Sequence, residues 1–177
     1  MFAFYLNLFT LALLLIVFAF FVVQAFNISF RGFAPFVSTH PKVLKKILQE
    51  LSITDNSTII ELGCGHAGFL RAVHDENSRA KLIGIEYARL LVWSARLQNA
   101  LAGTKIKIVR QNIIDTDLRE ADVVYCYLNQ DTMDKLRHKL ETELRKGATV
   151  VSYKFPLPAL TPHRVFDTDK DGERVYF

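Results

Sequence analysis

The chain has 177 residues, a net charge of +4 and two cysteines, and its first 30 residues contain no Asp, Glu, Lys or Arg. This length fits a single globular domain, with enough chain after residue 30 for a sizeable core. The mild positive charge, without a concentrated basic stripe, argues against a nucleic-acid partner. Cys64 and Cys126 show no C-x-x-C or metal-ligand spacing, so we expect reduced core thiols in a cytosolic domain and no bound metal.

The N-terminal segment is almost continuously apolar over residues 1–26. A helix of about 20 such residues crosses a hydrocarbon core of roughly 30 Å, so residues 1–30 are predicted to be a transmembrane anchor. A cleaved signal peptide is the alternative, because residues 23–25 resemble a cleavage site, but no positive residue precedes the long apolar run. Basic residues begin only at Arg31, which predicts a single-pass membrane protein whose domain, residues 31–177, is cytoplasmic.

A short helix is predicted over residues 41–51, with Thr39 as its cap and Pro41 in its first turn. Apolar residues recur on one face of this helix and Lys42, Lys45 and Lys46 lie on the other. The apolar face suits packing beside a sheet. The lysines are also compatible with contact to lipid headgroups.

A glycine-rich turn follows at residues 58–68, with the sequence TIIELGCGHAG. A β-branched run, then a carboxylate, then glycines at 63, 65 and 68 predict a strand, a tight turn and a helix. Glycine suits such a turn because it accepts positive φ and allows the backbone to approach a nucleotide-like ligand. Two acids strengthen this interpretation: Glu61 precedes the glycines, and Glu86 ends the next apolar run at about the distance expected of a ribose-binding acid.

These motifs resemble the first two motifs of class I S-adenosylmethionine methyltransferases. The resemblance implies that Glu61 anchors the methionine end of the cofactor and that Glu86 holds the ribose hydroxyls. Asn112 matches a position that contacts adenine, although a local turn role for it is equally open. The full set of cofactor-binding residues expected from the resemblance is Thr39, Glu61, Gly63, Cys64, Gly65, Glu86, Tyr87, Asn112 and Ile113.

Two other interpretations of the turn remain. It can be structural, without a ligand, or it can bind NAD. The NAD site is disfavoured because nicotinamide fingerprints rarely carry an acid at the place of Glu61, and because little chain follows for a substrate domain.

The remaining chain alternates predicted helices and strands. Helices are expected over 69–76, 88–102 and 131–146, and strands over 81–86, 106–110, 121–128 and 148–155. In the third helix, Met133, Leu136, Leu140 and Leu144 recur at helical spacing, so they are expected in the core. This order predicts an α/β fold, a Rossmann-like class I methyltransferase sheet that is mostly parallel.

The C-terminal residues contain a calcium-loop look-alike. Asp167, Asp169, Asp171 and Gly172 match the opening of an EF-hand, but the acid required at the twelfth position would be residue 178. A hairpin turned by Asp-Gly, with strands over 163–168 and 173–177, is predicted instead. It supplies the antiparallel member of the sheet.

The resemblance can be narrowed over nearly the whole chain. The apolar N-terminus, PFVST at 35–39, YCYL at 125–128 and VVSYKFPLP at 150–158 resemble the small membrane-anchored protein-lysine methyltransferases. That family includes mitochondrial enzymes acting on the adenine nucleotide translocase and on the ATP synthase c-subunit, and it has prokaryotic relatives. The chain departs from the eukaryotic members at His66-Ala67, where Asp-Gly is frequent.

The acceptor is expected at the carboxyl end of the fourth strand, where the sequence reads YLNQ. Tyr127 and Asn129 are candidates for orienting it, against the alternatives of a core tyrosine and a helix N-cap. The Asn/Asp-Pro-Pro-aromatic signature of enzymes that methylate bases is absent, so the prediction is S-adenosylmethionine-dependent methylation of a protein lysine at the membrane. A small-molecule or lipid methyltransferase and a non-catalytic membrane-tethered scaffold are the other hypotheses.

Overall fold

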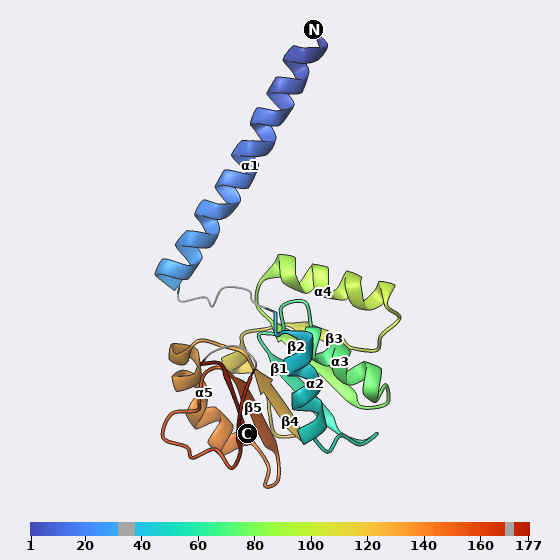
Figure 1. Ribbon diagram of the computed structural model, residues 1–177, viewed down its shortest axis with the longest axis vertical. Coiled ribbons are helices and arrows are strands. Elements are labelled where there is room, and N and C mark those ends of the chain that lie inside the picture. Colours follow the sequence, from blue (N-terminus) through green and yellow to red (C-terminus); the bar gives the residue numbers. More distant parts are fainter. Residues whose placement is uncertain (32–37, 169–171) are drawn as a thin grey trace. The chain divides into compact units, whose positions relative to one another are not determined.

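The computed structural model describes residues 1–31, 38–168 and 172–177. It contains two compact units, Met1–Pro35 and Phe36–Phe177. The first unit is the helix α1, Phe2–Arg31 (Figure 1). Its stretch Ala3–Val23 has 21 residues, and its mean hydropathy reaches 2.8 over an 18-residue window, so by length and composition it can cross a membrane. Signal sequences share both properties.

The second unit is built around a seven-stranded sheet in the order β3-β2-β1-β4-β5-β7-β6. Its strands are β1 (Thr58–Leu62), β2 (Lys81–Glu86), β3 (Lys107–Arg110), β4 (Val123–Cys126), β5 (Thr149–Tyr153), β6 (Val165–Asp167) and β7 (Arg174–Tyr176). The first five pair in parallel, and β7 pairs antiparallel with both β5 and β6. The predicted parallel sheet with a C-terminal antiparallel hairpin is therefore confirmed.

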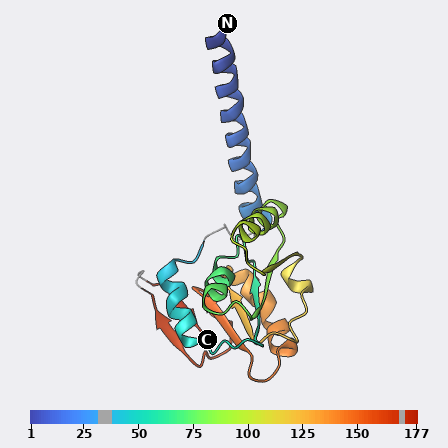
Figure 2. The same cartoon turned by 90° about the vertical axis from the view of Figure 1, so that its right-hand side faces the viewer.

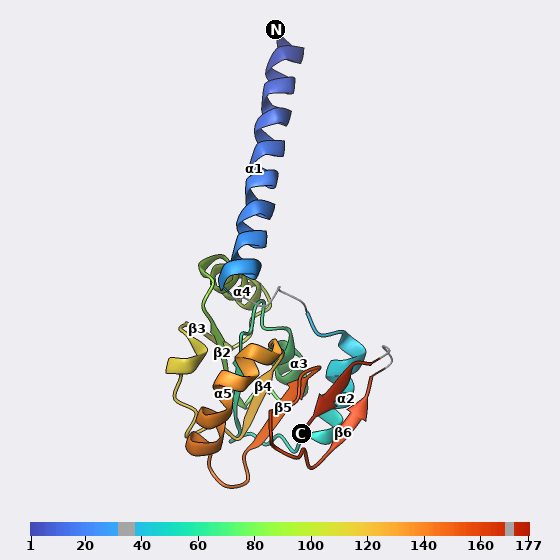
Figure 3. The same cartoon turned by 90° about the vertical axis from the view of Figure 1, so that its left-hand side faces the viewer.

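Helices cover both faces of this sheet. They are α2 (Pro41–Glu50), α3 (Gly68–Glu76), α4 (Arg89–Leu101) and α5 (Gln130–Glu143), with a short 3-10 turn η1 (Ile113–Asp115) after β3. Alternate residues of β4 face opposite sides: Val123 and Tyr125 join a core with α2, α3 and α4, whereas Val124 and Cys126 join a core with α5. Figures 2 and 3 show α5 on one side of the sheet and α2 and α3 on the other.

The start of α2 differs from the prediction by one residue. His40, not Thr39, is the N-cap, and its Nδ1 accepts a hydrogen bond of 3.3 Å from the Lys42 amide. Because Pro41 is the first helical residue, the capping position falls on residue 40. Thr39 instead shares a hydrogen bond of 2.6 Å with the hydroxyl of Tyr125.

The other corrections concern the ends of elements. Helix α5 ends at Glu143 rather than at residue 146, because Leu144 is extended (φ −70°, ψ 136°) and packs against the α5-side core. Strands β4 and β5 are shorter than predicted. Pairing stops at Cys126, so the two residues that follow, Tyr127 and Leu128, belong to the loop at the carboxyl edge of the sheet. The core positions Met133, Leu136 and Leu140 are confirmed as buried.

Candidate active site

The turn after β1 combines three residues in the left-handed region. Gly63 has φ +72°, Gly65 has φ +52° and Ala67 has φ +60°. The positive φ favours glycine at position 63, and a Cβ there would lie 2.8 Å from Cδ2 of Leu128, so the Leu128 side chain would have to shift. Ala67 tolerates its conformation at a cost of about 1 kcal/mol. The turn thus keeps a backbone shape at residue 67 for which glycine is the usual choice.

Glu86 is fixed against this turn by the backbone. Its Oε2 accepts a hydrogen bond from the Gly65 amide at 3.0 Å, and its Oε1 accepts one from the Ala88 amide at 2.8 Å. A carboxylate can accept about four hydrogen bonds, so both oxygens keep capacity for further donors such as a ribose diol. The end of β2 and the turn after β1 therefore present one preorganised acceptor at the carboxyl edge.

Glu61 is buried in β1, with 7% of its surface exposed, and accepts a 3.4 Å hydrogen bond from the Leu70 amide in α3. Burial raises the pKa of Glu61 to about 8, and the negative charge of Glu86 adds to this effect, while the Leu70 amide and the positive charge of Arg71 oppose it. At neutral pH this carboxyl group holds a proton. An ammonium group placed beside it would favour ionisation, so the site fits the amino end of a cofactor.

Cys64 contributes its backbone to the turn and its side chain to the core. The amides of Gly63 and Cys64 both donate to the Ile85 carbonyl at 2.9 Å, which ties the turn to β2. Burial raises the pKa of the Cys64 thiol and raises that of Cys126 to about 12. Both cysteines are free, as expected, and are neutral thiols at physiological pH.

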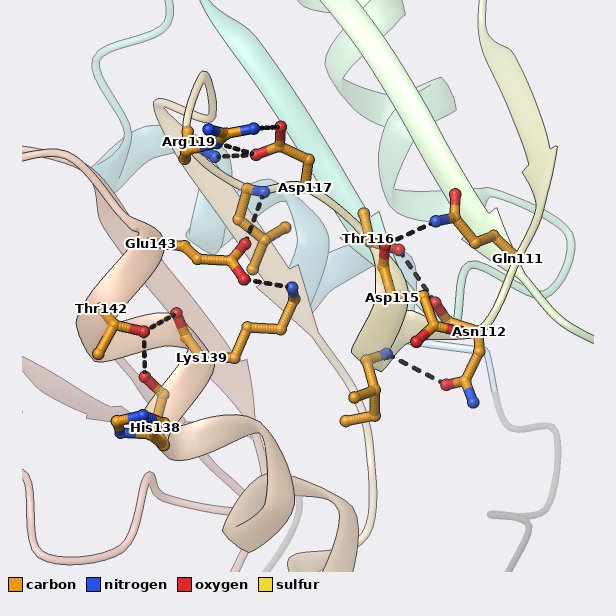
Figure 4. Close-up of polar contacts among 12 residues, drawn as sticks. Gln111, Asn112, Asp115, Thr116, Asp117, Arg119, His138, Lys139, Thr142 and Glu143 are labelled. Carbon is orange, nitrogen blue, oxygen red and sulfur yellow. Dashed lines mark hydrogen bonds and ion pairs between the residues drawn. The ribbon is translucent and has the colours of Figure 1, made fainter.

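The residues expected near adenine lie after β2 and β3. Tyr87 is exposed, and the Arg110 guanidinium carbon lies 5.7 Å from its ring centroid. Asn112 caps η1, since its Oδ1 accepts a hydrogen bond of 3.1 Å from the Ile114 amide (Figure 4). The local turn role considered for Asn112 is therefore present. Ile113 is half-buried and packs against the α5-side core.

The two acceptor candidates follow β4. Asn129 is the N-cap of α5, and its Oδ1 accepts hydrogen bonds from the Thr132 amide at 3.1 Å and the Thr132 hydroxyl at 2.6 Å. Its helix-cap alternative is thus realised. Tyr127 is half-buried, and its ring centroid lies 4.6 Å from that of Tyr153 at an interplanar angle of 53°. Neighbouring parallel strands therefore end in a pair of aromatic rings.

Three contacts of this edge were not anticipated from sequence. Tyr125, opposite Glu61 in the β1–β4 register, stacks on Phe69 with centroids 4.1 Å apart and holds Thr39 through its hydroxyl. The Tyr153 hydroxyl donates to the Glu173 carboxylate, which links β5 to the β7 side of the hairpin. Each contact joins residues far apart in sequence, so no local pattern signals it. The Thr39–Tyr125 pairing places Thr39 on the same sheet face as Glu61.

Some expected features cannot be placed. Residues 35–37 of the PFVST motif lie outside the described residues, as do Asp169 and Asp171 of the calcium-loop look-alike. Asp167, the first acid of that look-alike, accepts a hydrogen bond from Arg174 across the hairpin at 2.8 Å.

The strand order, the glycine turn after β1 and the carboxylate that ends β2 together define a class I S-adenosylmethionine-dependent methyltransferase. The comparisons with known proteins agree. The ANTKMT methyltransferase domain model matches residues 61–164, so the chain belongs to this family.

Relatives and solved structures resemble most of the chain. A protein-lysine N-methyltransferase of Saccharolobus islandicus is 28% identical over 81% of this chain and 90% of its own length. The adenine nucleotide translocase lysine N-methyltransferase of Mus musculus is 30% identical over 80% of this chain and 62% of its own length. The crystal structure of an RNA methyltransferase from Salinibacter ruber with S-adenosyl-L-homocysteine has a TM-score of 0.74 and 28% identity, and covers 79% of this chain and 91% of its own.

The residues of this edge fit S-adenosylmethionine on structural grounds. Backbone donors orient the Glu86 carboxylate and leave its oxygens capacity to accept from a diol. Burial raises the pKa of Glu61, so a cationic group beside it would be favourable, and the positive φ of Gly63 favours glycine in the turn. The carboxyl ends of β1, β2 and β4 meet here, which is the expected ligand crevice of an open parallel sheet.

Proposed function

We propose that this methyltransferase modifies a lysine side chain of a protein at a membrane. The observation that carries the proposal is its membership of the ANTKMT family, together with two relatives named as protein-lysine N-methyltransferases. The aromatic pair Tyr127 and Tyr153 at the carboxyl edge also supports the proposal. A lysine ammonium group must be desolvated and must lose its proton before it can react, and an aromatic environment favours both changes.

The cofactor site that we propose consists of residues at the ends of three strands, β1, β2 and β3, together with Thr39, which precedes α2. Glu86 accepts from the ribose hydroxyls, and Glu61 faces the amino end of the cofactor. The backbone of the glycine turn allows close approach, and Asn112 lies toward the base. The complete proposed set is Thr39, Glu61, Gly63, Cys64, Gly65, Glu86, Tyr87, Asn112 and Ile113.

S-adenosylmethionine supplies an electrophilic methyl group on a sulfonium centre. The protein has to hold the acceptor nitrogen in line and exclude water. A lysine amine has an unperturbed pKa near 10.4, so an environment that disfavours its charge promotes the neutral nucleophile. Burial raises the pKa values of Tyr127 and Tyr153, so both rings stay uncharged beside the acceptor. We propose that Tyr127 orients the acceptor. We also propose that Asn129, as the N-cap of α5, holds the loop after β4 in which Tyr127 lies.

We further propose that residues 1–30 anchor residues 31–177 to the membrane with the catalytic part in the cytoplasm. The apolar stretch Ala3–Val23 and the onset of basic residues at Arg31 support this arrangement. Protease treatment of right-side-out vesicles should leave residues 38–177 intact and remove an epitope placed at the N-terminus. If the protease outside the vesicles digested residues 38–177, the opposite orientation would be shown.

A nucleic-acid acceptor is the second candidate, because the Salinibacter ruber structure is that of an RNA methyltransferase. The loop after β4 reads YLNQ and lacks the Asn/Asp-Pro-Pro-aromatic signature, which favours the lysine acceptor.

The acceptor class can be tested by incubating the full chain and methyl-labelled S-adenosylmethionine with membrane proteins, extracted lipids and RNA. Methyl-lysine in hydrolysed protein is the expected product, and Glu86→Ala should lower its yield at limiting cofactor. Label in lipid or RNA alone would overturn the lysine acceptor and leave the methyltransferase class intact.

A further inference from the structure

Helix α4 carries its large apolar side chains on the outside. Leu90, Trp93, Leu97 and Leu101 are 74%, 67%, 44% and 81% exposed. They recur every three or four residues and so form one stripe, which we call the α4 stripe. The buried residues of the same helix are smaller or polar: Val92, Ala95 and Asn99. An amphipathic helix ordinarily turns its largest apolar residues to the core, so this helix has a second apolar face that the described residues of the folded unit leave uncovered.

The α4 stripe lies in the most basic part of the chain. Residues 87–114 contain five Arg or Lys and no Asp or Glu, against a net charge of +4 for the whole chain. The cations are Arg89, Arg96, Lys105, Lys107 and Arg110, and all are exposed. The positive charge is thus concentrated in one segment, whereas the mild net charge of the whole chain had led us to expect no concentrated basic region. The rest of the chain has a slight excess of acid.

We propose that α4 lies along the surface of an anionic lipid bilayer, with the α4 stripe in the boundary between headgroups and acyl chains. Helices that lie in a membrane interface carry leucine and tryptophan on one face and are rich in basic residues, and α4 with the segment that follows it has this composition and contains no acid. Tryptophan is enriched at this depth, and each basic residue near an anionic surface adds to the attraction.

Charge favours lipid over the other occupants of the α4 stripe. A second copy of the chain would bring two strongly basic segments face to face, where like charges repel. RNA would match the cations but would leave Leu90, Leu97 and Leu101 in water. An anionic bilayer satisfies both the charge and the apolar surface.

The proposed contact is coupled to the cofactor site by position. Helix α4 begins three residues after Glu86, and the ring of His66 in the glycine turn lies 3.2 Å from the Ser94 hydroxyl and 3.3 Å from the Gln98 amide nitrogen. A bilayer that holds α4 therefore also orients the turn that binds cofactor. This contact does not depend on which acceptor the enzyme methylates.

Trp93 is the only tryptophan of the chain, so its fluorescence reports directly on α4. The full chain would be reconstituted in vesicles of phosphatidylcholine and phosphatidylglycerol, with and without lipids brominated along the acyl chains. We expect a blue-shifted emission that brominated lipid quenches. The quenching should weaken in pure phosphatidylcholine and in roughly 1 M salt, where the Debye length is about 3 Å.

A reporter on the opposite face of the sheet is the matched control. The variant Trp93→Phe with His138→Trp moves the only tryptophan to an exposed position of α5, whose buried residues belong to the other core. Its emission should stay unshifted and unquenched in the same vesicles. Quenching as strong as at Trp93 would show that the effect is not specific to α4 and would overturn the proposal.

Variants of the α4 stripe test the contact itself. Leu90→Ser, Leu97→Ser and Leu101→Ser combined should lower quenching of Trp93 roughly twofold or more, because the inserted apolar area falls. Cofactor affinity in detergent should persist, which shows that the fold is kept. Leu160→Ser, at an exposed leucine outside α4, should change neither.

Three further results would overturn the proposal. If lipid neither shifted nor quenched the emission of Trp93, a bilayer contact of α4 would be excluded. A blue shift without lipid quenching that grows with the protein-to-lipid ratio would show a second copy on the α4 stripe. A change on adding RNA, with none on adding lipid, would show a nucleic-acid surface.

Discussion

The two halves of the sheet hold their parts of the proposed site by different kinds of contact, backbone hydrogen bonds in one and side-chain contacts in the other. In the β1–β2 half, backbone amides fix the carboxylate of Glu86 and the backbone carbonyl of Ile85 fixes the glycine turn. In the β4–β5 half the contacts are between side chains: the Tyr127 ring packs against the Tyr153 ring, and the Tyr153 hydroxyl donates a hydrogen bond to Glu173. The first half suits a constant ligand, the cofactor, whereas the second can change with the acceptor while the backbone stays the same. Variants should therefore separate cofactor binding from methyl transfer.

The largest effect is expected at Gly63. In Gly63→Val a β-branched residue would be strained at a φ of +72°, and its Cβ would lie 2.8 Å from the Leu128 side chain, so we expect the turn to distort and cofactor binding to fall below detection by calorimetry. Gly103→Val is the matched control, because Gly103 has φ +65° but an added Cβ would meet no described atom within 4 Å. It should lose stability from backbone strain yet bind cofactor normally. Equal binding by both variants would contradict a role of the turn in the site.

Removing the carboxylate of Glu86 should come next. Glu86→Ala is expected to weaken cofactor binding by about 1–3 kcal/mol, since ribose hydroxyls lose a charged acceptor and the Gly65 amide loses its partner. Calorimetry with S-adenosylhomocysteine measures this loss. Glu76→Ala removes an exposed acid from the end of α3 and should change the affinity by less than about 0.5 kcal/mol. Similar losses in the two variants would point to a general charge effect.

Glu61 should make stability depend on pH. Its folded pKa of about 8 lies above the ordinary value of 4.5, so the folded state holds a proton that the unfolded chain releases between these pH values. The contribution to stability is complete below about pH 4.5 and is lost as pH rises to about 8, at up to about 1.4 kcal/mol per pH unit. Urea unfolding of the ligand-free chain at several pH values measures this slope. Glu61→Gln should flatten it, and an unchanged slope would show that other groups cause it.

The same proton links pH to cofactor affinity. A cationic amino group beside Glu61 favours the ionised carboxylate, so affinity should rise from about pH 6 to about pH 8 in the parent chain. In Glu61→Gln this rise should disappear. Titration calorimetry across this interval would contradict the assignment if both proteins gained affinity equally.

The smallest effect on binding is expected in the acceptor half. Tyr127→Ala should leave cofactor affinity within about twofold of the parent and lower methyl transfer about tenfold, because it removes one ring of the aromatic pair that we propose for the acceptor site. Tyr127→Phe keeps the ring and should retain most activity. A large loss of cofactor affinity in Tyr127→Ala would show that this residue contributes to cofactor binding and would contradict the division between the halves.

The two halves also differ in how far sequence alone predicts them. The turn, Glu61 and Glu86 follow from a local pattern, because a strand, glycines and a second strand end specify a Rossmann-like crevice within about 30 residues. Sequence placed the helix cap at Thr39, one residue early, because Thr39 is a good capping residue while Pro41 fixes the helix start. The Thr39 side chain, left outside the cap, shares a hydrogen bond with Tyr125 instead.

Contacts across the sheet were beyond sequence reasoning. The Tyr153–Glu173 bond requires β7 to dock against β5, and the Phe69–Tyr125 stack requires α3 to lie over β4. The predicted span of α4 was nearly correct, but its helical pattern did not reveal which apolar residues face the sheet. Only packing shows that Val92 is inside and Trp93 outside.

The dependence of methyl-lysine formation on cofactor concentration tests the division between the halves most directly. Mass spectrometry of the acceptor protein would follow the product for the parent, Glu86→Ala and Tyr127→Ala. We predict that Glu86→Ala recovers most of the parent rate at saturating S-adenosylmethionine, whereas Tyr127→Ala stays about tenfold slower at every concentration. Recovery of Tyr127→Ala but not of Glu86→Ala, or a methyl group on a residue other than lysine, would contradict the account.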